Sequence, residues 1–175
     1  MKRIVVGISG ASGTHLACRF ISQLKQYTEC EVHVVVTDSG RLTASYEEPE
    51  LFDKALALAD NVHSNASLGE SIASGTFKTE GMVIIPCSMK TVAGIASGYS
   101  DNLLLRAADV TLKEQRPLVL VARETPMNAI HLRNLAQLAS VSGITLMPPM
   151  MTMPVRIPPT MPMAMGGMPM GMLFS

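Results

Sequence analysis

The chain has 175 residues, about the length of one domain, and its 14 lysines and arginines balance 14 aspartates and glutamates. A formal net charge of zero gives no overall attraction to nucleic acid or to an anionic membrane, so neither is expected as a partner. Hydrophobic residues make up 47% of the chain and charged residues 16%, which supports a full core and predicts surface buried between subunits.

The three cysteines, Cys18, Cys30 and Cys87, are odd in number and lack CxxC spacing. This pattern favours neither a disulfide framework nor a thiolate zinc site, so we expect reduced cysteines and a cytoplasmic protein. The apolar run near the N-terminus is too short for the core of a signal peptide. Residues 161–174 are also apolar, but prolines and glycines interrupt them, and they fall short of the ~20 residues of a membrane-spanning helix.

Between residues 3 and 147, short β-branched runs alternate with longer helical patterns, which is typical of βαβ units around a parallel sheet. Five strands are expected, at residues 3–8, 32–36, 82–86, 118–121 and 144–147. Five helices are expected, at residues 14–26, 50–59, 89–96, 102–115 and 126–141, with segment 61–80 irregular apart from one short strand at most. Thr125 and Pro126 read as the N-cap and first residue of the last helix. The pattern predicts one α/β domain over residues 1–147, with both faces of its sheet covered.

The last residues, 147–175, are a different kind of sequence, with ten of the 14 methionines and seven of the 11 prolines. Proline at this density blocks both helices and central strands, so an irregular or extended tail is expected over 148–175. Three interpretations remain open: a thioether site for a soft metal, an extended or disordered arm on a neighbouring subunit, and a non-native C-terminus such as a shifted reading frame produces.

A glycine-rich turn follows the first predicted strand and leads into a helix, with the sequence Gly10-Ala11-Ser12-Gly13. Such a turn lets backbone N–H groups approach a phosphate at a helix N-terminus, although a tight bend without a ligand is the alternative. The spacing is GxxGxxG, which does not meet the GxGxxG dinucleotide pattern. A short-chain reductase is excluded because none of the three tyrosines is followed four residues later by lysine.

Two further clusters carry polar groups near strand ends. Pro86-Cys87-Ser88-Met89-Lys90-Thr91 places hydroxyls and a lysine at the start of a helix, where an anion is favoured, while Cys87 itself is either a nucleophile or a small buried residue. Arg106, Asp109 and Lys113 share one helical face, as a functional group or as a surface salt-bridge ladder. Arg123 and Glu124 follow the next strand, where a cation beside an acid could help to expel a phosphate. The four histidines show no metal spacing and are expected to be structural or exposed.

Taken in order, four motifs resemble the UbiX-type flavin prenyltransferases, some of which are named as a subunit of phenolic or aromatic acid decarboxylases. The motifs are Gly10-Ala11-Ser12-Gly13, Pro86-Cys87-Ser88-Met89-Lys90-Thr91, Arg106-Ala107-Ala108-Asp109-Val110 with Leu112-Lys113-Glu114, and 116–121 with Arg123-Glu124. The resemblance implies a three-layer, flavodoxin-like or Rossmann-like fold and a homo-oligomer, with a dodecamer as one candidate size. It also implies a metal-free transfer of the dimethylallyl group from dimethylallyl phosphate to reduced FMN, whose product serves a UbiD-type decarboxylase.

The same resemblance implies the site residues. The FMN contacts it implies are Gly10, Ala11, Ser12, Thr37, Ser88, Met89, Lys90, Thr91 and Arg123. Ser12 and Glu47 would manage the proton at flavin N5. Arg106, Lys113 and Glu124 would assist the departure of phosphate, and several of these groups are expected to come from neighbouring subunits.

The resemblance ends near residue 150. Family members continue with a tyrosine and a basic residue that hold the prenyl phosphate, whereas no tyrosine follows Tyr99 here, and Arg156 is the one cation of the tail. Two alternatives therefore stay open. One is an FMN-binding protein or decarboxylase accessory subunit without turnover. The other is a decarboxylase related to the phosphopantothenoylcysteine type, whose catalytic histidine has no recognisable counterpart here.

Overall fold

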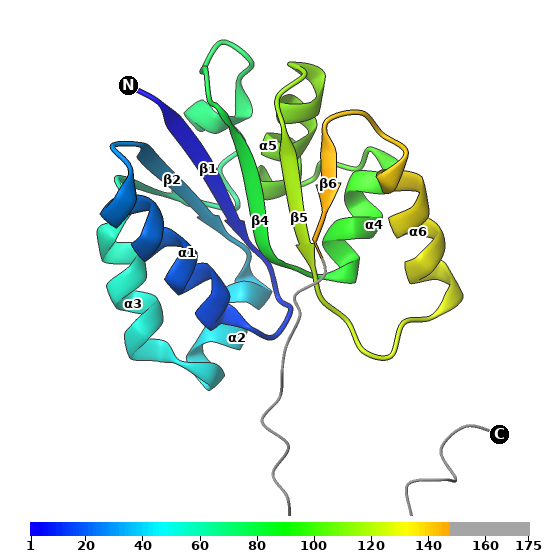
Figure 1. Cartoon of the computed structure of the whole chain (residues 1–175), viewed down its shortest axis with the longest axis horizontal. Helices are drawn as coiled ribbons and strands as arrows, with labels where there is room; N and C mark the ends of the chain where they lie inside the picture. Colours follow the sequence, from blue (N-terminus) through cyan, green and yellow to red (C-terminus); the bar gives the residue numbers. More distant parts are fainter. Residues whose placement is uncertain (148–175) are drawn as a thin grey trace, which may run out of the picture.

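The structure, a computed structural model, describes residues 1–147 (Figure 1). The predictions of an irregular or extended tail over 148–175, and the three interpretations of that tail, lie outside the described residues. The six strands are β1 (Arg3–Ile8), β2 (Glu31–Val36), β3 (Asn61–Ser64), β4 (Gly81–Cys87), β5 (Leu118–Ala122) and β6 (Ile144–Leu146). The helices are α1 (Thr14–Tyr27), α2 (Asp38–Glu47), α3 (Pro49–Leu58), α4 (Met89–Ser97), α5 (Leu103–Lys113) and α6 (Ala129–Ala139), with a 3₁₀ turn η1 (Ser71–Ala73).

All six strands form one parallel sheet in the order β3-β2-β1-β4-β5-β6. The chain runs outward from β1 through β2 to β3, and then crosses to the other side of β1 to begin β4. The direction of winding therefore reverses between β1 and β4, which pair directly with each other. In open α/β sheets, the carboxyl ends of the strands at such a reversal form the usual binding crevice.

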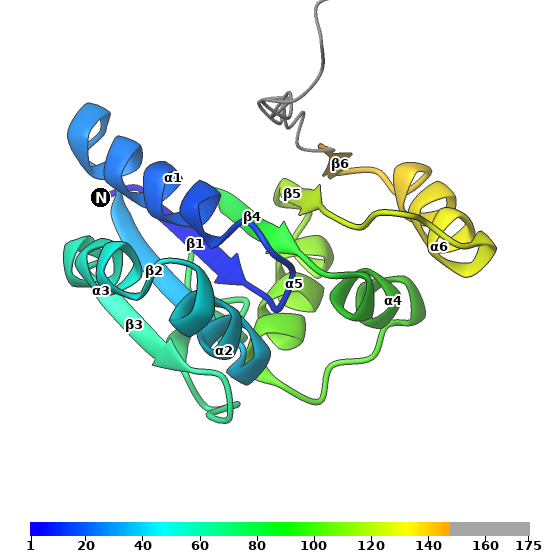
Figure 2. The same cartoon turned by 90° about the horizontal axis from the view of Figure 1, so that it is seen from below.

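Helices cover both faces of the sheet (Figure 2). On one face, α1 and α3 pack on β1 and β2 through a core that includes Val6, Ile21 and Phe52. On the other face, α4, α5 and α6 pack through a second core that includes Leu104 and Leu120. The β-branched residues of the strands are buried between these layers, which confirms the three-layer, flavodoxin-like or Rossmann-like prediction.

The start of the last helix was predicted wrongly. Helix α6 begins at Ala129, and its N-cap is Asn128, whose side chain accepts a hydrogen bond from the N–H of His131 at 2.9 Å. The His131 ring in turn accepts from the Asn128 N–H at 3.3 Å, which completes a reciprocal cap. Thr125 does not cap this helix because it lies three residues before the N-cap Asn128, and its hydroxyl donates to the Glu124 carbonyl at 2.8 Å.

One helix was absent from the sequence prediction. Helix α2 contains glycine, serine and threonine at positions that weaken a helical pattern, and only Gly40 and Ala44 are buried. Its start is fixed instead by Thr37, whose hydroxyl accepts a hydrogen bond from the Gly40 N–H at 3.0 Å. The short strand allowed for in segment 61–80 is β3, at the edge of the sheet.

A buried hydroxyl fastens the two strand ends at the reversal. Ser9 is 2% exposed, and its Oγ donates to the Pro86 carbonyl at 2.9 Å while it accepts from the Ser88 N–H at 2.7 Å. The turn after β1 and the turn after β4 are thus held together by one short, buried side chain.

Replacing Ser9 with alanine tests this fastening. In Ser9→Ala the Pro86 carbonyl keeps the Ser9 backbone N–H at 3.2 Å, but the Ser88 N–H loses its acceptor. We expect the free energy of unfolding in urea to fall by about 1–3 kcal/mol, the cost of one unsatisfied buried donor. The exposed Ser12→Ala is the matched control and should stay within about 0.5 kcal/mol of the parent. Equal stabilities of the two variants would contradict the role given to Ser9.

Candidate functional site

Two glycines let the turn after β1 approach its neighbours. A Cβ on Gly10 would lie 2.5 Å from the Cβ of Ser39, in the first turn of α2. Gly13 has a φ of +101°, and a Cβ there would lie 2.9 Å from Nη1 of Arg123. A side chain at either position would therefore push away α2 or the Arg123 guanidinium.

Three helices begin around this turn, each behind a side-chain cap. Thr37 caps the start of α2, as described above. At the start of α4, the Ser88 Oγ accepts from the Thr91 N–H at 3.4 Å. The Asn102 Oδ1 accepts from the Leu105 N–H at 3.0 Å at the start of α5. A helix N-terminus presents free N–H groups and about half a positive charge, so three of them at one rim favour an anion.

Two adjoining cavities lie at the rim. The first, here called the Lys90 cavity, has a volume of about 260 Å³ and is lined by Gly10, Thr37, Asp38, Ser39, Asn65, Ser88, Lys90, Thr91, Asp101, Asn102 and Leu105. The second, here called the Arg123 cavity, has a volume of about 270 Å³ and is lined by Gly10, Ala11, Ser12, Ser88, Arg123, Glu124 and Thr125. Both include Gly10 and Ser88, so they are two parts of one cleft above β1 and β4.

The chemistry of the two cavities differs. The Lys90 cavity combines the three helix starts with an ammonium group, and it holds two carboxylates, Asp38 and Asp101, which can accept from hydroxyl groups. The Arg123 cavity places one guanidinium and one carboxyl group, that of Glu124, on the same wall. The cleft therefore suits a molecule with an anionic end, hydroxyl groups and a polar planar end.

Most of the residues proposed from the resemblance meet at this cleft. Ser12 and Glu124 line the Arg123 cavity, and eight of the nine proposed cofactor contacts line one cavity or the other. The exception is Met89, whose side chain is buried in the core beneath α4 and lines neither cavity. Glu47, Arg106 and Lys113 also line neither.

Glu47 caps the start of α1. Its carboxylate accepts from the Gly13 N–H at 3.0 Å, from the Thr14 N–H at 2.8 Å and from the Thr14 hydroxyl at 2.7 Å. Burial opposes ionisation, but these hydrogen bonds prevail and lower the pKa of Glu47. A carboxylate from α2 thus occupies the N-terminus of α1, which explains why this helix start differs from the three at the cleft.

Arg106 and Lys113 lie on α5, and neither lines the cleft. Arg106 pairs with Asp109 at 3.1 Å, and Lys113 lies 3.5 Å from Glu114 at the opposite end of α5 from Asn102. Their side chains are 41% and 59% exposed, respectively. Within one protomer, the three groups proposed to release phosphate do not meet.

Sequence reasoning missed several residues of the cleft. The link through Ser9, the wall formed by Asn65 and the cap formed by Asn102 became visible once the fold brought these segments together. Only Asn102 had a local signal, an asparagine directly before an apolar helical run. Cys87 is fully buried, and burial raises the pKa of its thiol, so the structure supports the small buried residue rather than the nucleophile.

The described residues 1–147 contain no helix long and apolar enough to cross a membrane and no group of three or more metal-binding side chains.

Comparison with known proteins agrees with this geometry. The family described as Flavoprotein matches residues 1–169. The probable UbiX-like flavin prenyltransferase of Sedimentibacter hydroxybenzoicus is 49% identical over 150 residues, which cover 86% of this chain and 79% of the relative. The flavin prenyltransferase LpdB of Lactiplantibacillus plantarum is 51% identical over 149 residues, covering 85% and 79%.

Solved structures give the same answer. A dodecameric FMN-dependent UbiX-like decarboxylase from Escherichia coli O157:H7 superposes with a TM-score of 0.81 and 44% identity, covering 85% of this chain and 80% of the other. AnUbiX (PadA1), solved in complex with FMN and dimethylallyl pyrophosphate, superposes with a TM-score of 0.79 and 42% identity, covering 84% and 77%. With a matching family model, sequence and fold, this chain belongs to the flavoprotein family and, within it, to the UbiX-like flavin prenyltransferases.

Proposed function

We propose that this chain binds FMN in the rim cleft and transfers the dimethylallyl group of dimethylallyl phosphate to the reduced cofactor. The observation that carries the proposal is the joining of the two cavities. An anion site at three helix starts continues, through Gly10 and Ser88, into a site with a guanidinium and a carboxyl group. When bound, reduced FMN supplies the electron pair that accepts the prenyl group.

The residues of the cleft fit FMN in one direction. The phosphate belongs in the Lys90 cavity, where Ser88 and Thr91 add hydroxyls to the helix N–H groups. The ribityl hydroxyls can donate to Asp38 and Asp101. The flavin ring then lies in the Arg123 cavity, beside the glycine turn, of which Gly10, Ala11 and Ser12 line the wall.

Glu124 and Arg123 supply the chemistry expected of this chain at the ring end. Breaking an allylic C–O bond leaves a phosphate whose charge must be met, and a fixed guanidinium does this without reorganisation. Glu124, exposed on the wall of the same cavity, can deliver a proton to the departing phosphate. Ser12, also on this wall, is proposed to handle a proton on the cofactor side.

The remaining charges are proposed to come from another copy of the chain. Arg106 and Lys113 are half-exposed on α5 and so are available to a neighbouring subunit. Large apolar side chains are also exposed, which supports assembly: Tyr27, Leu42, Tyr46, Leu58, Tyr99, Ile130 and Leu132. The dodecameric relative from Escherichia coli O157:H7 supports a closed homo-oligomer as the functional form.

We further propose that the product is passed to a separate UbiD-type decarboxylase and that the reaction takes place in the cytoplasm. The first proposal follows from family membership. The second is supported by the cysteines, since Cys18, Cys30 and Cys87 are all free.

The proposed reaction is tested by mixing the purified full chain with FMN, dithionite and dimethylallyl phosphate and following the prenylated flavin by mass spectrometry. We expect adduct from the parent and a fall in kcat of about 10²-fold in Glu124→Gln, the usual size of a proton-transfer contribution. FMN affinity should stay within about twofold, because the proton is used after binding. Ser12→Ala should show the same separation of turnover from binding.

Glu80→Gln is the matched control. Glu80 is exposed just before β4, at the amino-terminal ends of the strands, opposite the cleft. A yellow protein that retains FMN yet forms no adduct would favour the binding module over the enzyme. Equal losses of FMN affinity and turnover in Glu124→Gln would show that its role is misassigned. Release of carbon dioxide from a phenolic acid by this chain alone would favour a decarboxylase.

A second prediction concerns Glu47, proposed to act at flavin N5 and observed to cap α1. Its lowered pKa means that its stabilising effect is present above the unfolded value of about 4.3 and is lost as the pH falls through the folded value. At pH 7 we expect Glu47→Gln to unfold with a free energy about 1 kcal/mol below that of the parent, from the lost charge at the helix N-terminus. The two proteins should converge toward pH 3 in urea denaturation. A gap that persists unchanged at pH 3 would contradict the helix-capping role.

A further inference from the structure

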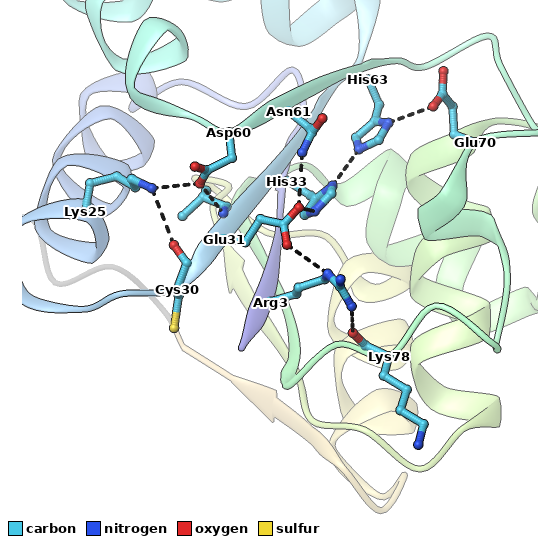
Figure 3. A network of polar contacts seen from close by, with 11 residues as sticks. Arg3, Lys25, Cys30, Glu31, His33, Asp60, Asn61, His63, Glu70 and Lys78 are labelled. Carbon is cyan, nitrogen blue, oxygen red and sulfur yellow. Dashed lines mark hydrogen bonds and ion pairs between the residues drawn. The ribbon is translucent and has the colours of Figure 1, made fainter. Parts of the chain in front are cut away.

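Four titratable side chains form a continuous chain at the β2–β3 edge of the sheet (Figure 3). Glu31 Oε1 lies 3.0 Å from His33 Nε2, His33 Nδ1 lies 2.9 Å from His63 Nε2, and His63 Nδ1 lies 2.9 Å from Glu70 Oε2. The two imidazole rings are nearly parallel, at 16°, and their side chains are 4% and 7% exposed. The central contact is therefore shielded from water.

The number of protons in this chain follows from its geometry. An ionised carboxylate only accepts, so each outer ring nitrogen must carry an N–H to reach Glu31 or Glu70. The contact between the two rings needs one more N–H. Two neutral imidazoles carry two N–H groups in total, whereas three contacts need three protons. The chain holds one proton more than two neutral histidines and two carboxylates can supply.

The surroundings indicate where that proton lies. The Arg3 guanidinium donates to Glu31 at 2.9 Å. This hydrogen bond is the main reason why the pKa of Glu31 is lowered, so Glu31 stays ionised. Burial lowers the pKa of His33, which favours its neutral form despite the neighbouring Glu31 carboxylate. The added proton is thus assigned to the other half of the chain, on His63 or on Glu70.

The remaining neighbours do not supply a competing charge to this half. The Arg3 Cζ atom also lies over the Phe77 ring, 4.6 Å from its centre. The Asn61 side-chain amide donates to Glu31 at 3.4 Å. Lys25 and Asp60 next to β2 pair with each other at 2.7 Å. Lys78 meets this group through its carbonyl, which accepts from Arg3. The buried side chains of α5, which packs on this face, are apolar apart from Thr111.

The contact between His63 and Glu70 closes a loop that leads to the cleft. It joins His63, in β3, to Glu70, the residue just before η1. The two ends of segment 64–70 are therefore held together. Within this segment, the Asn65 carbonyl accepts from the Leu103 N–H at 2.9 Å and its side chain accepts from the Leu104 N–H at 3.0 Å. Asn65 therefore holds the start of α5 and also forms part of the wall of the Lys90 cavity.

We propose that the shared proton closes segment 64–70, and that His63 and Glu70 are positioning residues that fix Asn65 at the cofactor cleft. This role at the cleft rests on the proposed FMN site, whereas the proton count does not. In the unfolded protein the histidines lose their charge above a pKa of about 6.5. Above that pH the folded protein therefore binds one proton more than the unfolded protein. The stabilising effect of the shared proton is complete below this pH and is lost as the pH rises.

The variant Glu70→Gln removes the need for the added proton. Its side-chain amide can donate to His63 Nδ1, so two neutral imidazoles then satisfy all three contacts. Between pH 6.5 and 9, we expect the unfolding equilibrium constant of the full-length parent to rise more steeply than that of Glu70→Gln, by up to about tenfold per pH unit. Glu29→Gln, which removes the same charge from the exposed turn before β2, is the control and should keep the parental slope.

Histidine-selective ¹⁵N NMR of the same proteins counts the protons directly. At pH 7 the parent should show a third proton on the chain, as a third ring N–H or as a protonated Glu70 seen in ¹³C spectra, and Glu70→Gln should show two. Two ring protons and an ionised Glu70 in the parent would overturn the proposal, as would equal unfolding slopes for the parent and Glu70→Gln.

The link to the cleft is tested by FMN titration over the same pH range. We expect the dissociation constant of the parent to increase several-fold more between pH 6.5 and 9 than that of Glu70→Gln. A constant ratio of the two dissociation constants would overturn the positioning role. If neither protein binds FMN, the proposed function fails and the positioning role with it, while the NMR and unfolding measurements still decide the proton count.

Discussion

The cleft depends on the close approach of the turn after β1 to the start of α2 and to the turn after β4. Gly10 allows the first contact, since a Cβ there would meet Ser39, and Gly40 allows the same approach from α2, where a Cβ would lie 2.8 Å from the Ile8 carbonyl. The Thr43 hydroxyl adds a donor to the Gly10 carbonyl at 3.2 Å. On the other side, the Ser9 hydroxyl joins the turn to β4. These contacts are made by glycines and by short serine and threonine side chains that bond to the backbone. They bring the helix starts close together without any long side chain.

This arrangement explains how a chain of zero net charge can recognise an anion. The attraction comes from N–H groups at the starts of α2, α4 and α5, which the fold orients before any ligand arrives. Lys90 and Arg123 each add one positive charge to their cavity, but Asp38 and Asp101 line the first cavity and Glu124 the second, so the helix N–H groups carry most of the attraction. The attraction is therefore local, which is consistent with a formal net charge of zero for the whole chain.

The sequence predicted the parts of the fold that depend on local pattern. The β-branched runs identified five strands, and the glycine turn and Ser88 were correctly placed at strand ends, because each signal is contained within a few residues. Helix α2 was missed because its stability comes from the cap at Thr37 and from packing rather than from its composition. The histidine pair was missed for a related reason: His33 and His63 are 30 residues apart and meet only through the pairing of β2 with β3.

The site residues divide in the same way. Those of the glycine turn and of Ser88 to Thr91 lie together because short turns at neighbouring strand ends must lie together in a parallel sheet. Arg106 and Lys113 belong to a helix that runs away from the rim, and the distance along that helix from Leu103 to Lys113 is about 15 Å. Neither Arg106 nor Lys113 lines the Arg123 cavity of its own protomer. If these cations act on the departing phosphate, a second copy must present them, and burial between subunits would then strengthen their attraction for the phosphate by excluding water. A chain with so few surface charges and so many exposed apolar side chains is suited to that arrangement, because assembly then covers the apolar surface and completes the charge of the site in one step.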